Sequence, residues 1–120
     1  MAQQKLDQFL AALGARRFDD VKATFAPDVK FRFLMPGVAG EADGADDVAG
    51  KFQAWFGWPE KLEVVTTVGE TVVDRYAFKY RFRALKTDAG WRTIQQQGMM
   101  DISDSGITAI DLVCSGFRAE

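Results

Sequence analysis

Apolar side chains recur every three or four residues in three segments of the chain, a spacing typical of amphipathic helices. The first segment predicts a helix over about residues 3–13, with Gly14 just past its end. The second predicts a short helix that Pro27 stops. The third predicts a helix around residues 48–56, and aspartates near its start suit the positive end of the helix dipole.

In the rest of the chain apolar and polar residues alternate, which indicates strands with one buried and one exposed face. Residues 36–44, PGVAGEADG, have the composition of a loop. The pattern of residues 62–72 leaves open which face of that strand is buried. The predicted strands cover about 28–35, 62–72, 75–86, 91–102 and 107–117.

The strand at 75–86 carries aromatic rings at every second position and cations between them. The rings are those of Tyr76, Phe78, Tyr80 and Phe82, and the cations are Lys79, Arg81 and Arg83. We expect the rings to face inward and the cations outward.

The order of the elements predicts an α+β fold. Three helices cannot cover both faces of a sheet of five strands, so we expect them on one face. Long antiparallel strands twist and curl. We therefore predict one domain, residues 1–120, built as a cone: a curved, mostly antiparallel sheet wrapped around a pocket by the three helices.

Three phrases of the sequence carry a family resemblance: FLAALGARRFDDVKATFAPDVKFRF, GEADGADDVAGKF and SDSGITAIDL. With them the chain resembles the nuclear transport factor 2-like superfamily, in particular SnoaL-like proteins and ketosteroid isomerase-type folds. The resemblance covers nearly the whole chain and implies the cone-shaped fold. It does not imply one activity, since this fold hosts isomerases, cyclases, dehydratases, epoxide hydrolases and proteins without catalytic activity.

The resemblance also implies where catalytic groups would stand. Ketosteroid isomerases keep a tyrosine where this chain has Phe9, a base where it has Phe33, and a second aspartate near Gly98. SnoaL-type cyclases place an acid/base aspartate at about Ser115. The Asp-Arg-Asp pattern of limonene epoxide hydrolases is not visible either. The resemblance therefore supports the fold, and none of these mechanisms transfers.

The predicted inner face is apolar and aromatic, and we expect it to bind a small hydrophobic ligand. Gln96 is the polar exception, and a short turn at 87–90 places it across from Tyr80. The two groups either satisfy each other as a structural pair or orient a ligand carbonyl or hydroxyl. The predicted ligand-binding residues are Phe9, Phe31, Phe33, Met35, Phe52, Trp55, Phe78, Tyr80, Phe82, Gln96, Met100, Ile110 and Leu112.

The composition narrows the chemistry. The chain has no histidine and one cysteine, which argues against a zinc site and against Ser-His or Cys-His nucleophiles. We expect no metal and no cofactor. The remaining catalytic candidates are Tyr80 and Gln96 on the inner face and Glu41 and Asp43 on the predicted loop, which would rim the mouth of the pocket.

The expected partners follow from charge. A net charge of -2 argues against nucleic acid. No stretch is long and apolar enough for a membrane span and the start of the sequence is unlike a signal peptide, so a cytoplasmic protein is expected. The mixed polar outer face of the sheet fits a homodimer interface, and the family resemblance implies the same.

Two functions stay open from the sequence. One is an isomerase, cyclase or dehydratase of an apolar carbonyl compound, with Tyr80 and Gln96 polarising the substrate and Glu41 or Asp43 as base. The other is a non-catalytic hydrophobic-ligand-binding or dimerisation domain.

Overall fold

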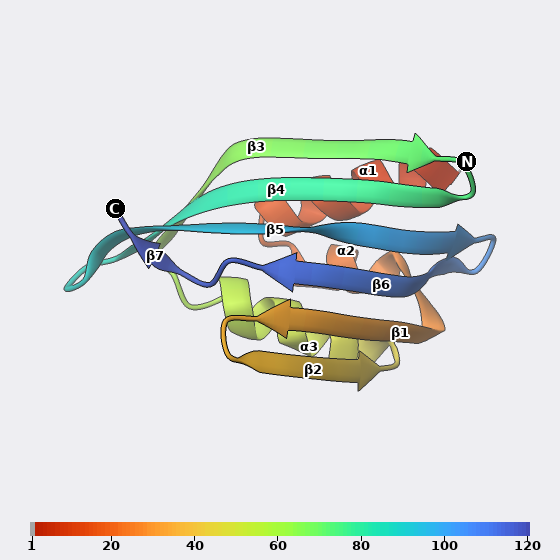
Figure 1. Cartoon of the computed structure of the whole chain (residues 1–120), viewed down its shortest axis with the longest axis horizontal. Coiled ribbons are helices and arrows are strands. Elements are labelled where there is room, and N and C mark those ends of the chain that lie inside the picture. The colour runs from red at the N-terminus through yellow and green to blue at the C-terminus, as the bar shows by residue number, and fades with distance from the viewer. Residues whose placement is uncertain (1) are drawn as a thin grey trace.

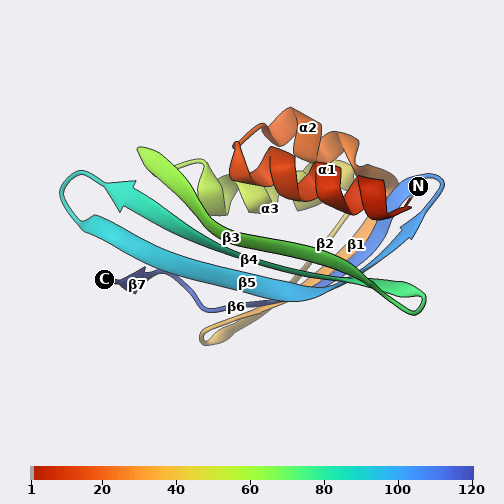
Figure 2. The same ribbon diagram turned by 90° about the horizontal axis from the view of Figure 1, so that it is seen from above.

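The strands pair into one curved sheet, and the helices lie together on one of its faces (Figures 1 and 2). The structure is a computed structural model and describes residues 2–120. The helices are α1 (Ala2–Gly14), α2 (Phe18–Ala23) and α3 (Ala45–Phe56). The strands are β1 (Phe25–Met35), β2 (Val38–Asp43), β3 (Lys61–Val72), β4 (Arg75–Lys86), β5 (Gly90–Ser103), β6 (Gly106–Cys114) and β7 (Arg118–Ala119).

The sheet has the strand order β2-β1-β6-β5-β4-β3, with β7 beside β5. The pair of β1 and β6 is parallel, and the other pairs are antiparallel. Figure 2 shows the helices over the concave side of the bent sheet. The prediction of an α+β fold with a curved, mostly antiparallel sheet and helices on one face is confirmed.

The prediction of a loop over residues 36–44 is wrong for residues 38–43, which form β2. This strand pairs with the second half of β1, from Lys30↔Asp43 to Met35↔Val38. The turn between the two strands contains Gly37 with φ +76°, a value that glycine adopts without strain. Glycine, alanine and aspartate are poor strand formers, so β2 depends on its pairing with β1 and not on local preference.

The ends of other strands also differ from the prediction. β1 begins at Phe25, before Pro27, and its pairing with β6 shifts between Phe25 and Lys30. That irregularity accommodates a residue without an N–H. The strand predicted over 107–117 corresponds to β6, which ends earlier, at Cys114. Residues 115–117 connect β6 to β7.

The structure assigns the facing of β3 that the pattern left open. Thr67 pairs with Tyr80 and shares its inner face, whereas Val68 pairs with Lys79 on the outer face. A bulge between Val64 and Thr66 shifts the alternation along this strand, which explains why no simple period was visible.

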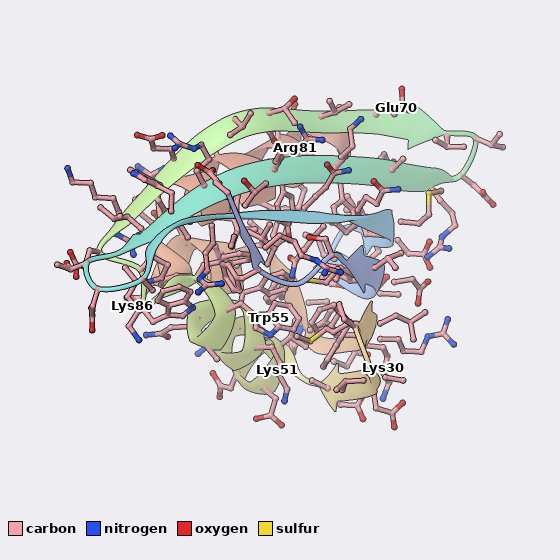
Figure 3. All side chains as sticks on the ribbon, turned by 60° about the vertical axis from the view of Figure 1, so that its left-hand side comes forward. Lys30, Lys51, Trp55, Glu70, Arg81 and Lys86 are labelled. Carbon is pink, nitrogen blue, oxygen red and sulfur yellow. The ribbon has the colours of Figure 1, made fainter. Side chains whose placement is uncertain are left out.

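Aromatic side chains of the helices and the sheet pack against one another between the two layers. Phe52 of α3 lies 5.2 Å from Phe31 and 5.4 Å from Phe9 between ring centroids, and Phe56 lies 5.3 Å from Phe82. These five side chains are at most 1% exposed. In Figure 3, Trp55 lies at the edge of this cluster, while Lys30 and Glu70 project to the exterior.

β5 and β6 approach closely at Gly98, which lies opposite Leu112 of β6. A Cβ atom added at Gly98 would overlap the carbonyl oxygen of Asp111. We expect Gly98→Ala to lower the free energy of unfolding by about 3 kcal/mol or more in urea denaturation, because backbone must move. Gly50→Ala is the control: nothing lies near its added Cβ on α3, so it should raise stability by about 0.5–1 kcal/mol. Equal effects of the two substitutions would contradict this account.

Candidate functional site

The structure brings the predicted ligand-binding residues together on the inner face of the sheet and the helix faces opposite. Met35 and Trp55 are half-buried, and the other residues of that set are buried. The rings of Phe78, Tyr80 and Phe82 stack along β4, with centroid distances of 6.0 and 4.8 Å. The role of these residues in binding a ligand stays a prediction.

A buried chain of hydrogen bonds crosses this apolar interior. Tyr80 and Gln96 are direct neighbours across β4 and β5, as predicted, and the Tyr80 hydroxyl donates to Gln96 Oε1. Gln96 Nε2 donates to Cys114 Sγ at 3.2 Å, and the backbone N–H of Gly116 donates to the same sulfur at 3.3 Å. Gln96 is 0% exposed. The interpretation of Tyr80 and Gln96 as partners is therefore confirmed.

The hydrogen-bonding capacity of Gln96 exceeds these contacts. Its amide has two N–H donors and an oxygen with two lone pairs. Within residues 2–120, Tyr80 uses one lone pair of the Gln96 oxygen, and Cys114 accepts from one of the two Gln96 N–H donors. The amide of Gln96 therefore keeps one donor and one lone pair beyond its bonds to Tyr80 and Cys114.

The polar groups of this interior suit hydrogen bonding. Burial raises the pKa of Tyr80 well above its usual value, so its hydroxyl stays protonated and is a hydrogen-bond donor. In addition to Tyr80 and Cys114, the buried polar side chains of residues 2–120 are Thr24 and Gln96. No Asp or Glu of these residues is buried. The inner face thus contains hydrogen-bonding groups and, within the described chain, no buried carboxylate base.

The two carboxylates predicted at the pocket mouth lie elsewhere. Glu41 and Asp43 belong to β2 and are exposed on the outer face, across from Arg32 and Lys30. Asp43 forms an ion pair with Lys30 at 3.5 Å. Their placement on a loop at the mouth is wrong, because β2 pairs with β1 and its alternation turns both carboxylates away from the helices.

The positions implied by the family resemblance hold no acid or base. Phe9 and Phe33 are 0% and 7% exposed within the aromatic cluster. Gly98 has no room for a side chain, as described above. Ser115 accepts a hydrogen bond from the backbone N–H of Gln95 at 2.9 Å and lies in the segment after β6.

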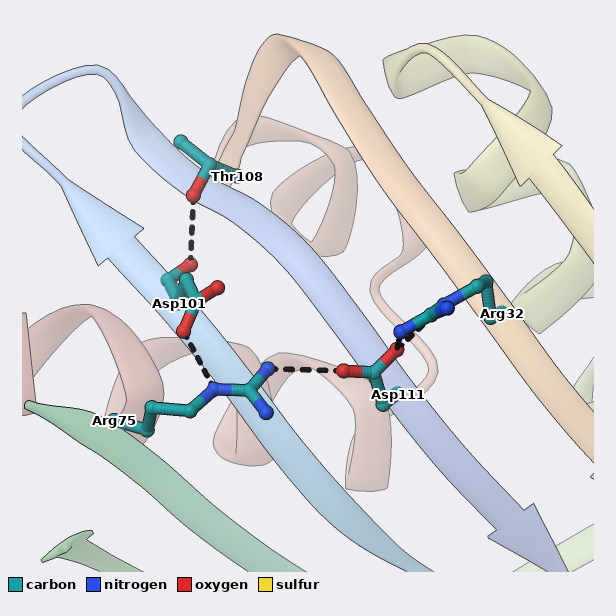
Figure 4. A network of polar contacts seen from close by, with 5 residues as sticks. All are labelled: Arg32, Arg75, Asp101, Thr108 and Asp111. Atoms are coloured by element: carbon teal, nitrogen blue, oxygen red, sulfur yellow. Dashed lines mark hydrogen bonds and ion pairs between the residues drawn. The ribbon is translucent and has the colours of Figure 1, made fainter.

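The outer face of the sheet carries an ion-pair network that the sequence did not reveal (Figure 4). Arg75 donates from Nε to Asp101 at 2.6 Å and from Nη2 to Asp111 at 2.9 Å. Arg32 binds the other oxygen of Asp111 at 2.9 Å. The alternation in the sequence indicated that Asp101 and Asp111 face outward. Which arginines they pair with depends on the register of β1, β4, β5 and β6, which the sequence does not specify.

This network keeps Asp111 ionised. Partial burial acts to raise the pKa of Asp111, but hydrogen bonds from Arg75 and Arg32 outweigh it and lower the pKa below its usual value. The contribution of the network to stability is therefore present at neutral pH and is lost as the pH falls through that lowered pKa.

An open hollow of about 760 Å³ lies beside the network on the outer face. Its apolar wall is formed by Leu34, Ala39, Met99 and Val113, and Arg32 borders it. Leu34 and Val113 are 56% and 51% exposed. Exposed apolar residues in one continuous region indicate a contact surface.

Within residues 2–120, no three His, Cys, Asp or Glu side chains come together in an arrangement suited to a metal ion. The helices of the same residues are all too short or too polar to cross a membrane.

Comparison with known proteins identifies relatives. The profile of the SnoaL-like domain matches residues 6–110. No curated protein matches the chain.

Three solved structures illustrate the similarity of fold. A protein from Kribbella flavida, provisionally described as a ketosteroid isomerase, superposes with a TM-score of 0.71 at 13% identity over 99% of this chain and 81% of that one. A provisional polyketide cyclase from Xanthomonas campestris gives 0.73 at 18% identity over 93% and 88%. A Catenulispora acidiphila protein with a ketosteroid isomerase-like fold, in complex with trimethylamine, gives 0.74 at 13% identity over 97% and 88%.

The buried Tyr80–Gln96 bond should couple the two residues energetically. We expect Tyr80→Phe and Gln96→Leu each to cost about 1–3 kcal/mol, because each leaves a buried partner unsatisfied. The double variant should cost about 1–2 kcal/mol less than their sum, measured by urea denaturation.

The pair of Arg81 and Gln95, one register step away on the outer face, is the control for this cycle. Its hydrogen bond is exposed, with 3.0 Å between Arg81 Nε and Gln95 Oε1. Arg81→Met and Gln95→Leu should therefore couple by less than about 0.5 kcal/mol. Additive effects at Tyr80 and Gln96 would show that their bond contributes nothing to stability.

Proposed function

Because this chain belongs to the SnoaL-like family, we propose that it binds a small apolar molecule on the inner face of its sheet, without proton transfer by a carboxylate. The observation that carries the proposal is the chemistry of that face. Aromatic and aliphatic side chains surround one fully buried amide, Gln96. Such a site favours an apolar ligand with one carbonyl or hydroxyl group.

The ligand class follows from the groups present. Phenyl rings and aliphatic chains favour ring systems such as steroids, aromatic polyketides or terpenoids. The remaining donor and lone pair of Gln96 suit a single polar substituent. The names of the similar structures, a provisional ketosteroid isomerase and a provisional polyketide cyclase, support the same ligand classes.

Binding without acid–base chemistry fits this site better than catalysis does. Enzymes that abstract protons tune a carboxylate or another base to a pKa near the working pH. Here Tyr80 is held neutral by burial, and Glu41 and Asp43 lie across the sheet from the interior. Tyr80 and Gln96 therefore act as positioning groups for the ligand.

A thermal-shift screen with these three compound classes tests the proposal. A ligand that binds the native state raises the melting temperature, and at a fixed ligand concentration the rise grows with the logarithm of the affinity. We expect Gln96→Leu to weaken the affinity about tenfold through one lost hydrogen bond, each variant being compared with its own ligand-free protein. Gln97→Leu is the control, since Gln97 is exposed on the outer face.

The proposal fails if no compound stabilises the protein. It also fails if Gln97→Leu weakens binding and Gln96→Leu does not, since the ligand would then bind on the outer face of the sheet.

A second candidate function concerns the outer face, and we propose that a second copy of this chain covers it. One cross-strand row of that face runs from β3 to β2 with mostly uncharged side chains: Val68, Lys79, Gln97, Val113, Leu34 and Ala39. The open hollow lies along this row. A curved apolar strip bordered by charges of both signs suits self-association about a two-fold axis.

Light scattering on a sizing column tests this dimer. We expect a dimer for the unchanged protein and a monomer for Val113→Lys, because a buried unpaired ammonium is costly at an interface. Val73→Lys is the control, since Val73 is 94% exposed in the β3–β4 turn and lies off the row. A monomeric unchanged protein, or dimers from Val113→Lys, would contradict the proposal.

A further inference from the structure

Residues 115–120, which we term the latch, follow β6. Ser115 is still bonded to Gln95 of β5, since its backbone N–H donates to the Gln95 carbonyl oxygen at 2.9 Å and its Oγ accepts from the Gln95 N–H at 2.9 Å. The segment then leaves the sheet and returns as β7. The two pairs that hold β7 on β5 are Arg92↔Ala119 and Thr93↔Arg118. Gly116, where the chain leaves the sheet, has φ +74°, in the left-handed region that favours glycine. A two-residue strand contributes few backbone hydrogen bonds, and segments held by few contacts are the ones that open at low free energy in folded proteins.

The latch lies directly against the buried hydrogen-bond chain. The backbone N–H of Gly116 donates to Cys114 Sγ at 3.3 Å, and the same sulfur accepts from Gln96 Nε2. Opening the latch therefore breaks the hydrogen bond from Gly116 to the sulfur that Gln96 also contacts.

Phe117 of the latch also covers the aromatic interior. Its ring lies 5.1 Å from that of Trp58 and 6.4 Å from that of Phe56, in edge contacts. Phe56 in turn lies 6.2 Å from Tyr80. Phe56 thus contacts both Phe117 of the latch and Tyr80, the partner of Gln96.

The latch also lies near a half-buried residue of the interior. Met35 and Trp55 are the half-buried residues of the predicted ligand-binding set. Gly116 lies against Pro36, the residue that follows Met35, since a Cβ atom added at Gly116 would be 3.2 Å from the Pro36 ring. The latch therefore borders the end of β1 that carries the half-buried Met35.

The side chain of Glu120 anchors the far end of the latch, where the backbone N–H of Glu120 also donates to the Trp91 carbonyl oxygen at 3.4 Å. Glu120 pairs with Arg83, whose Nε and Nη2 each lie 2.8 Å from one oxygen, and it accepts a hydrogen bond from Thr93 at 2.9 Å. Arg83 stacks on the ring of Trp91 at 4.3 Å. The hydrogen bonds from Arg83 hold the pKa of Glu120 at about 2, so this attachment stays charged at neutral pH.

From these contacts we propose that the latch gates the inner face: the Arg83–Glu120 pair holds it closed, and its displacement opens the path by which a ligand reaches Gln96. The ligand part of this proposal rests on the proposed function. The opening itself is a property of the chain and is measurable without any ligand.

Cys114 is the internal probe for this opening. It is the one cysteine of the sequence, it is 7% exposed, and the latch begins at the next residue. Labelling by a chromogenic disulfide reagent at neutral pH, under native conditions, therefore reports how often the latch opens. Global stability of each variant is measured in parallel by urea denaturation.

We expect Glu120→Gln to speed labelling of Cys114 about two- to fivefold, because it removes one exposed ion pair from the closed state. Thr93→Val should act in the same direction, since it removes the second hydrogen bond to Glu120. Glu63→Gln is the matched control: Glu63 binds Nη1 of the same Arg83 at 2.8 Å but lies on β3, outside the latch. It should leave the labelling rate unchanged.

Equal rates for the unchanged protein and Glu120→Gln would overturn the latch. Labelling rates that simply follow global stability across the three variants would overturn it too, because exposure of Cys114 would then need complete unfolding.

A ligand found in the thermal-shift screen separates this proposal from the proposed function. We expect it to slow labelling of Cys114 and to associate faster with Glu120→Gln. Faster labelling in Glu120→Gln with no ligand that protects Cys114 supports the opening and refutes the binding function. A third outcome is a ligand that needs Gln96 for its affinity and associates equally fast with the unchanged protein and with Glu120→Gln. That result supports the binding function and refutes the gate.

Discussion

The packing of aromatic rings between the helices and the concave face of the sheet is the interaction on which the rest of the structure depends. Phe52 joins α3 to β1 and α1 through Phe31 and Phe9, and Phe56 joins the end of α3 to β4. Large rings bury much apolar area and contact each other at their edges, so they hold helices and sheet at a defined spacing. The same rings leave the interior without buried carboxylates in residues 2–120, and this composition decides what chemistry the site can perform.

Polar groups are divided between the two faces of the sheet according to charge. The interior holds Tyr80, Gln96 and Cys114, which are linked by hydrogen bonds. The outer face holds ion pairs such as Arg75 with Asp111. A neutral hydrogen-bonding group can be buried at modest cost when it has a partner, whereas a charge needs water or an ion pair. This division makes the inner face suitable for an apolar ligand and the outer face suitable for a protein surface.

The proposed site and the latch meet at Cys114. This residue ends β6, accepts hydrogen bonds from Gln96 and Gly116, and so connects the buried amide to the segment that covers it. A rigid sheet holds the amide, and a weakly paired segment lies over it, which is the usual relation between a binding site and its covering element. Arg83 links this end of the molecule to β3 through Glu63 and to the latch through Glu120.

The sequence by itself determined the helices, the facing of β4 and the position of Gln96 across from Tyr80, because alternation and short turns are local properties of the chain. The family resemblance implied that Phe9 and Phe33 stand where related enzymes keep polar groups. Only the tertiary structure decided that residues 38–43 form β2, which turns Glu41 and Asp43 outward, and that Arg75 bridges Asp101 and Asp111. Both depend on pairing between strands distant in the sequence. Such pairing selects a register and a face that no local pattern specifies.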